Sequence, residues 1–145
     1  MNFVEISCDI NTTNAQVPLG LEIWIDGQCV FDQSSVTSAI AWRHSVSDHD
    51  GEHIIQWILK NKTQDHTVID EQGNILQDAR LIISNLSFDG IFELGHVFVT
   101  NSVYTHDHNG TTETADHKFY GEMGCNGSVS LKFTTPIYLW LLENL

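Results

Sequence analysis

Apolar and polar side chains alternate along most of the chain, and a period of two residues predicts β-strands. In residues 4–10 every second side chain is apolar, and in residues 53–59 Ile55, Trp57 and Leu59 share one face. The other predicted strands cover residues 21–25, 29–31, 36–46, 80–88, 96–104, 119–123 and 128–134. Nowhere do ten residues carry a stripe with a 3.6-residue period. The pattern therefore predicts an all-β fold, an antiparallel β-sandwich or jelly roll.

Asp-Gly and Asn-Gly pairs mark the predicted turns, because these residues tolerate the positive φ angles of a two-residue hairpin. Asp26-Gly27 predicts one hairpin, and Asn126-Gly127 predicts another that joins the strands on either side of it. The polar excursion at 60–78 is expected to contain a small hairpin of its own, turned at Gly73-Asn74.

Two further segments are expected to contribute apolar side chains to the core. The strand at 80–88 is expected to place Ile82, Leu86 and Phe88 on one face. Residues 137–143 are apolar and contain a tryptophan. They predict a strand or a single helical turn that closes the core or docks on a neighbouring molecule. The sequence has neither an internal repeat nor a linker, so residues 1–145 are expected to form a single β-sandwich domain.

The chain is strongly acidic, with 6 Lys+Arg against 19 Asp+Glu and a formal net charge of −13. Such a surface repels nucleic-acid phosphates and anionic membranes, so neither partner is expected. The N-terminal residues lack the basic and apolar regions of a signal peptide, which predicts synthesis without a secretory signal. The three cysteines have spacings that suit no zinc motif and are expected to be buried free thiols.

The excursion at 60–78 is the best candidate for a cation site or a partner contact, since long loops in compact domains are usually functional. Asp65, Asp70 and Asp78 supply carboxylates of the kind that bind calcium. A second acidic segment, residues 48–53, could hold calcium or be a solvated hairpin turn.

Histidines offer a different kind of metal site. His106 and His108 point to the same side of an extended strand, and with a third ligand they could bind zinc. His117 follows nearby in the sequence. The alternative is that these residues form an exposed polar loop.

No catalytic activity is expected, because serine-nucleophile and phosphate-loop motifs are absent from the sequence. Cys125 is not expected to be a nucleophile, because its position is better explained by a hairpin turn at Asn126-Gly127. Trp42 and Trp57 are in phase with apolar neighbours and are expected in the core. Trp24 lies on the face opposite its apolar neighbours, which makes it the candidate for stacking on a sugar ring.

Three blocks, residues 21–31, 51–61 and 78–90, resemble the calcium-dependent xylan-binding carbohydrate-binding modules. Asn61 matches the asparagine that ends a strand of that family, and Asp78 matches the aspartate that reopens the next one. Asp89-Gly90 matches the close of that strand, whereas Lys62 stands where the family has an acidic residue. The resemblance implies a β-sandwich that recognises a surface glycan and possesses a calcium site.

A second resemblance is to proteins of tailed marine bacteriophages. It rests on residues 60–63, 78–81, 118–127 and 131–142. It implies a non-catalytic virion component, such as a tail, baseplate or capsid-decoration module. That component would be made in the host cytoplasm and would assemble with other virion proteins as a homo- or hetero-oligomer. We expect this role from the sequence, with calcium-dependent glycan binding as the alternative.

Overall fold

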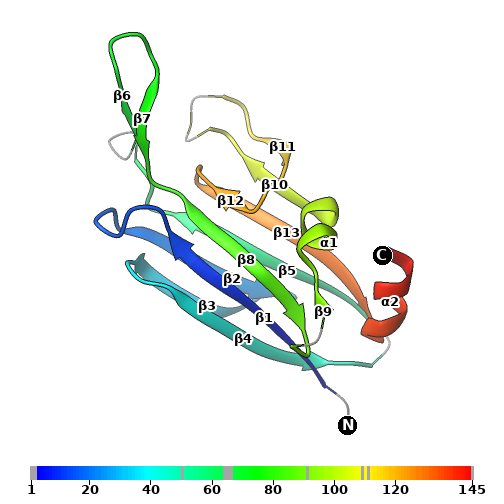
Figure 1. Ribbon diagram of the computed structural model, residues 1–145. Helices are drawn as coiled ribbons and strands as arrows, with labels where there is room; N and C mark the ends of the chain where they lie inside the picture. The colour runs from blue at the N-terminus through cyan, green and yellow to red at the C-terminus, as the bar shows by residue number, and fades with distance from the viewer. Residues whose placement is uncertain are drawn as a thin grey trace.

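Two antiparallel sheets face each other across one apolar core (Figure 1). The computed structural model describes residues 3–49, 51–63, 67–90, 92–108, 110 and 112–144. Within these residues, five strands form the first sheet. They are β12 (Glu122–Met123), β8 (Leu81–Phe88), β1 (Phe3–Thr12) and β4 (Ile40–Ser47) in that order, with β9 (Phe92–Glu93) also paired to β8.

The second sheet has six strands within the described part of the chain. Their order is β11 (Ala115–Lys118), β10 (Ser102–His106), β13 (Gly127–Thr135), β5 (Gly51–Lys60), β2 (Leu19–Ile25) and β3 (Gln28–Val36). A small hairpin, β6 (Thr67–Ile69) and β7 (Ile75–Asp78), projects beyond one end of the sandwich (Figure 1). Two short helices, α1 (Gly95–Asn101) and α2 (Ile137–Asn144), complete the fold.

The alternating residues of both sheets fill the core, which confirms the predicted all-β sandwich. Every second residue from Val4 to Ile10 is buried, as are Ile55, Trp57 and Leu59 of β5. Trp42 is buried on β4, so both predicted core tryptophans are in place. Helix α1 adds Phe98, whose ring centroid lies 4.9 Å from that of Trp57. The alternation therefore records which side of each strand faces the opposite sheet.

The hairpin turns at Asp26-Gly27 and near Gly73 are confirmed. Asp26 and Gly27 have φ angles of 52° and 80°, as a two-residue turn between β2 and β3 requires. Gly73 has a φ of 85° at the tip of the β6–β7 hairpin.

The predicted face of residues 80–88 is wrong in its first half. Leu81 and Ile83 are buried there, and Ile82 is only half-buried. The register of β8 against β1 shifts between Ser7 and Asp9, and Asn85 has a φ of 55°. One extra residue is accommodated as a β-bulge, which reverses the phase of the strand before Leu86.

Several predicted strands have different boundaries, and only Glu122–Met123 (β12) of the predicted strand 119–123 lies in a strand. Val36 ends β3, and a new strand, β4, begins at Ile40, so 36–46 is not one strand. Residues 96–104 divide between helix α1 and strand β10. A helix of seven residues is too short to reveal a 3.6-residue stripe in the sequence.

The hairpin predicted at Asn126-Gly127 is also wrong. Strand β12 pairs with β8 in the first sheet, whereas β13 starts at Gly127 and pairs with β10 and β5 in the second. The chain crosses between the sheets at this point instead of turning back on itself.

The C-terminal segment 137–143 lies in helix α2, longer than the single turn allowed from the sequence. Ile137, Trp140 and Leu141 are buried, so one side of the helix closes the end of the core. Tyr138, Leu139 and Leu142 are exposed on this helix.

The three free thiols are not all buried, in contrast to the expectation from the sequence. Cys8 is buried, Cys125 is half-buried and Cys29 is exposed on β3. Burial raises the pKa of the Cys8 thiol to about 12, so this group remains a neutral apolar component of the core.

Candidate functional site

Trp24 lies on the outer face of the six-stranded sheet. Its neighbours in the strand, Ile23 and Ile25, point into the core, and the Trp24 side chain is half-buried. Its indole Nε1 donates a hydrogen bond of 2.9 Å to Glu22 Oε1. This bond fixes the ring in one orientation. The exposed part of the Trp24 ring, the residue predicted to stack on a sugar, therefore presents a rigid surface.

A charged network stabilises the same region. Lys60 Nζ lies 3.1 Å from Glu22 Oε2 and 2.7 Å from Asp32 Oδ1. Hydrogen bonds to Asp32 and then to Glu22 raise the pKa of Lys60, so its positive charge persists at neutral pH. The glutamate that orients Trp24 is thus itself held by a cation.

The strand register places further polar groups beside Trp24. Trp24 pairs with Gln56 of β5, which in turn pairs with Ser130 of β13, so these side chains form one row. The next row along the strands contains Asp26, Ile54 and Lys132, linked by the bond from Asp26 N to Ile54 O and the pairing of Ile54 with Lys132. We call the six residues of these two rows the outer-face platform.

The second row of the platform lines a hollow of about 500 Å³. Glu52, Thr134 and Trp140 also contribute to its walls. His53 Nδ1 lies 2.7 Å from Asp26 Oδ2, and the Ile54 amide donates a 2.9 Å bond to Asp26 Oδ1. The Asp26 carboxylate is therefore fixed at the edge of the hollow.

The structure does not bring the three predicted calcium ligands together. Asp65 lies outside the described residues. Asp70 organises the tip of the β6–β7 hairpin, where it accepts 2.9 Å bonds from the amides of Gln72 and Asn74. Hydrogen bonds from the Asn74 side chain and then from its backbone lower the pKa of Asp70. Asp78 pairs with Thr67 at the base of the hairpin, and Thr67 is three residues, or about 10 Å along the strand, from Asp70.

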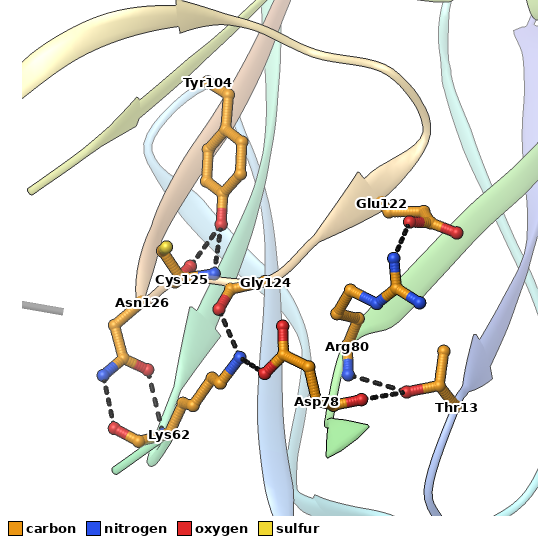
Figure 2. Close-up of polar contacts among 9 residues, drawn as sticks. All are labelled: Thr13, Lys62, Asp78, Arg80, Tyr104, Glu122, Gly124, Cys125 and Asn126. Carbon is orange, nitrogen blue, oxygen red and sulfur yellow. Dashed lines mark hydrogen bonds and ion pairs between the residues drawn. The ribbon is translucent and has the colours of Figure 1, made fainter. Parts of the chain in front are cut away.

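Asp78 binds an ammonium group instead (Figure 2). Lys62 Nζ donates hydrogen bonds of 2.6 Å to Asp78 Oδ1 and 2.5 Å to the carbonyl oxygen of Gly124. The Lys62 side chain is only 1% exposed. Its backbone is held by Asn126, which accepts a 2.9 Å bond from Lys62 N and donates a 2.7 Å bond to Lys62 O. We call Lys62, Asp78, Gly124 and Asn126 the lysine corner.

The lysine corner does not fit a calcium ion. Calcium requires six to eight oxygen ligands. Here the Asp78 carboxylate and the Gly124 carbonyl already accept hydrogen bonds from the buried ammonium group of Lys62. The ammonium group and a calcium ion would repel each other at such a short distance. The cation at this corner is therefore the ammonium group of Lys62 itself.

A buried tyrosine holds the neighbouring segment in place. Tyr104 donates a hydrogen bond from its hydroxyl to Cys125 O and accepts one of 2.9 Å from Cys125 N (Figure 2). Burial raises the pKa of Tyr104, so the hydroxyl remains a donor at neutral pH. Tyr104 thus anchors the backbone of Cys125, the residue that follows the Gly124 carbonyl.

The acidic segment 48–53 has structural roles in its described residues, and Asp50 lies outside them. Asp48 Oδ1 accepts a 2.9 Å bond from Ile137 N at the start of helix α2. His53 Nε2 lies 3.2 Å from Thr135 Oγ1 in addition to its contact with Asp26. Both side chains hold other elements in place. The hairpin predicted at this segment is wrong, because β4 pairs with β1 in the first sheet whereas β5 pairs with β2 and β13 in the second.

Three histidines come together at the β10–β11 edge of the second sheet. His106 and His117 have ring centroids 4.0 Å apart, and His108 lies 4.5 Å from His106 and 5.0 Å from His117. Burial, followed by the proximity of His117 and His108, lowers the pKa of His106. His117 is the third member that the sequence could not assign, because only strand pairing brings it next to His106.

The remaining platform residues were not identified from the sequence. Gln56 and Ile54 alternate with the buried residues of β5, so the period of two already places them on an outer face. Their position beside Trp24 depends on which strands pair, and this follows only from the structure.

No helix in the described ranges is long and apolar enough to cross a membrane.

Comparisons with known proteins support the fold. No family model matches the chain, and no curated protein matches its sequence. Among solved structures, the chain is similar to the selenomethionine form of the module vCBM60, from work on two families of calcium-dependent carbohydrate-binding modules linked by circular permutation. The TM-score is 0.53 and the identity 14%, over 88% of this chain and 89% of that one.

A second similar structure is vCBM60 in complex with galactobiose. It has a TM-score of 0.50 and 16% identity, over 88% of this chain and 96% of that one. At these identities the likeness concerns the fold alone. The chain is a two-sheet antiparallel sandwich similar to that of a calcium-dependent carbohydrate-binding module, as the first sequence resemblance implied.

Proposed function

We propose that this protein is a non-catalytic glycan-binding module that uses the outer-face platform. The observation that carries the proposal is the position of Trp24, a fixed and half-exposed indole ring, one row from a hollow of about 500 Å³. The shared sandwich fold of vCBM60 supports it. A rigid aromatic ring with polar groups around it is a common arrangement in ligand sites.

Each part of the platform has a role that suits a sugar. A pyranose ring has an apolar face of C–H groups, which can stack on the Trp24 ring. Its hydroxyl groups need donors and acceptors, which the Gln56 amide, the Asp26 carboxylate and the Lys132 ammonium supply. Galactose-containing oligosaccharides are the first class to test, because vCBM60 forms a complex with galactobiose.

Removal of the stacking surface is expected to weaken glycan binding. For Trp24→Ala we expect a dissociation constant for a galacto-oligosaccharide about tenfold higher, or ~1.4 kcal/mol, as measured by isothermal titration calorimetry. Trp24→Phe retains an aromatic face and should lose less affinity.

Tyr120→Ala is the matched control, because Tyr120 is 73% exposed and lies between β11 and β12. Affinity that drops in Tyr120→Ala but not in Trp24→Ala would place binding on another surface. If a glycan array detects no ligand for the wild-type protein, the proposed function is wrong.

We further propose that Lys62 replaces a structural calcium ion at the lysine corner. Its ammonium group neutralises Asp78 and binds the Gly124 carbonyl, which are the contacts that a cation would make there. Glycan binding at the platform would then be independent of calcium bound at this corner.

Neither calcium nor a chelator is expected to change the stability of the protein through the lysine corner. A ligand that binds the folded state raises the midpoint of thermal unfolding, so the midpoints in excess CaCl₂ and in EGTA should coincide. The glycan dissociation constants in the two buffers should coincide as well. A midpoint several degrees higher in calcium, retained when Asp70 is replaced by Asn, would contradict the lysine replacement.

Assembly into a virion stays a prediction from the second sequence resemblance. It is compatible with glycan binding, since a virion component can carry a glycan-binding module. Purified phage particles would test it, because a virion component is present at a fixed copy number.

A further inference from the structure

The histidine cluster, His106, His108 and His117, has the residue types and the arrangement of a metal site. His117 pairs with Tyr104 across β10 and β11, and His106 follows Tyr104 by two residues. Residues that pair directly, and residues two apart on one strand, project from the same face of a sheet. His106 and His117 therefore lie together on the inner face, at its edge.

His108 reaches the same point by a backbone turn. It follows the end of β10 and has a φ of 52°, in the left-handed region, which bends the chain directly after the strand. Its ring is at about a right angle to the other two, with interplanar angles of 80° and 81°. One ligand nitrogen from each of the three residues lies within 4.8 Å of the other two.

The His117 ring leaves one buried nitrogen without a hydrogen bond within the described part of the chain. His117 Nε2 is buried from solvent and has no hydrogen-bond partner among the described residues. A buried polar atom without a partner is rare, because it forfeits the bonds that it makes with water. A bound ion would satisfy this nitrogen.

The other two rings are also arranged to offer a lone pair. The hydroxyl of Thr112 lies 3.1 Å from His108 Nδ1 and can accept a hydrogen bond from its N–H, and in that tautomer the lone pair of the ring is on Nε2. His106 Nδ1 accepts a 3.1 Å bond from the amide of His108. Coordination through either nitrogen of His106 replaces only this one long hydrogen bond.

We propose that His106, His108 and His117 bind one divalent transition-metal ion, with zinc as the ion that this ligand set favours. Neutral imidazole nitrogens suit zinc and its neighbours in the first transition row, whereas calcium prefers oxygen ligands. Tetrahedral zinc with Zn–N bonds of 2.0–2.1 Å separates its ligand atoms by about 3.3 Å. The cluster must contract from its present spacing, and the exposed loop position of His108 permits this movement.

Three histidine ligands leave a fourth position on a tetrahedral ion. An open hollow of about 370 Å³ adjoins His106 and is also lined by Thr105, Asp107 and Asn126. Asp107 Oδ1 already accepts a 2.9 Å bond from the Gly110 amide. Water is therefore the simplest fourth ligand, and the site is open to solvent on that side.

Zinc titration of the full chain tests the proposal. After dialysis against EDTA and removal of the chelator, calorimetry should show one zinc ion bound per chain. Addition of that ion should raise the midpoint of thermal unfolding. Cobalt(II) in place of zinc should produce visible absorption bands of tetrahedral coordination, a readout that does not depend on any activity.

His108→Ala is the decisive variant, because His108 is exposed in a loop and its loss leaves the core intact. Its zinc affinity should fall by more than the 10–100-fold that is typical for a change outside the ligand shell. His117→Ala should have the same effect. His96→Ala is the control, since His96 is exposed on helix α1 and should leave both affinity and stoichiometry unchanged.

Two results would overturn the proposal. One is an equal zinc affinity in the wild type and in His108→Ala. The other is cobalt absorption that lacks the tetrahedral bands while zinc still binds, which would indicate coordination by surface carboxylates. Because no histidine of the cluster belongs to the outer-face platform, either result would leave the glycan proposal untouched.

Discussion

Lys62→Met is expected to lower the free energy of unfolding by about 3 kcal/mol, because it removes the buried ammonium group that binds both the Asp78 carboxylate and the Gly124 carbonyl. The Lys62 side chain is 1% exposed and that of Asp78 is 22% exposed, so water can reach only part of the remaining carboxylate. This partial access places the expected loss at the lower end of the range for broken buried ion pairs. Urea denaturation followed by tryptophan fluorescence measures it.

Lys60→Met is the matched control for this experiment. Lys60 lies two residues away on the same chain segment and also contacts two carboxylates, but at the surface. Surface ion pairs contribute little to stability, so a much smaller loss is expected. The double variant Lys62→Met with Asp78→Leu removes both charges and should recover part of the stability. Equal losses in Lys62→Met and Lys60→Met would show that the lysine corner does not stabilise the fold.

Gly127→Ala is expected to destabilise the protein by about 2–4 kcal/mol, because the new methyl group has no space between β10 and β13. A Cβ atom at this position would lie 2.3 Å from the Thr105 carbonyl oxygen and 2.8 Å from His106 Cβ. Gly127 pairs with His106 on one side and with Leu59 on the other, so β13 cannot move away from one neighbour without pressing on the next. Its φ of 156° adds backbone strain for a residue with a side chain.

Gly73→Ala separates the two causes. Gly73 has a φ of 85°, but a Cβ atom there would meet nothing within 4 Å. This variant should therefore lose only the cost of the backbone conformation, about 1 kcal/mol. Urea denaturation of both variants gives the comparison. A loss in Gly127→Ala no larger than that in Gly73→Ala would mean that β10 and β13 separate without cost.

The alternation of side chains was sufficient to predict the two-sheet architecture, since burial on one face of a strand acts on every second residue. It could not reveal helix α1, whose seven residues complete fewer than two turns. It also could not distinguish a hairpin at Asn126-Gly127 from a crossing between sheets, because the same residues permit both. That difference depends on the pairing of β12 with β8, which lies 40 residues earlier in the chain.

The candidate sites show the same division between local and long-range information. The outward position of Trp24 follows from its own strand, and the cationic character of the corner follows from Lys62. The partners of each residue do not. Asp78 was expected to bind a metal ion, and its ammonium partner became visible only in the structure, where Lys62, two residues after β5, meets the end of β7. His117 likewise joins His106 through the register of β10 and β11.

Asn85 behaves as an inserted residue in strand β8. If it is left out, Leu81, Ile83, Leu86 and Phe88 follow one another at every second position, and all four are buried. A relative that lacks this residue would keep the same apolar face without the positive φ angle. An alignment of distant homologues should therefore open a gap of one position here. Without that gap, the two halves of the strand cannot both be matched to the same ancestral pattern.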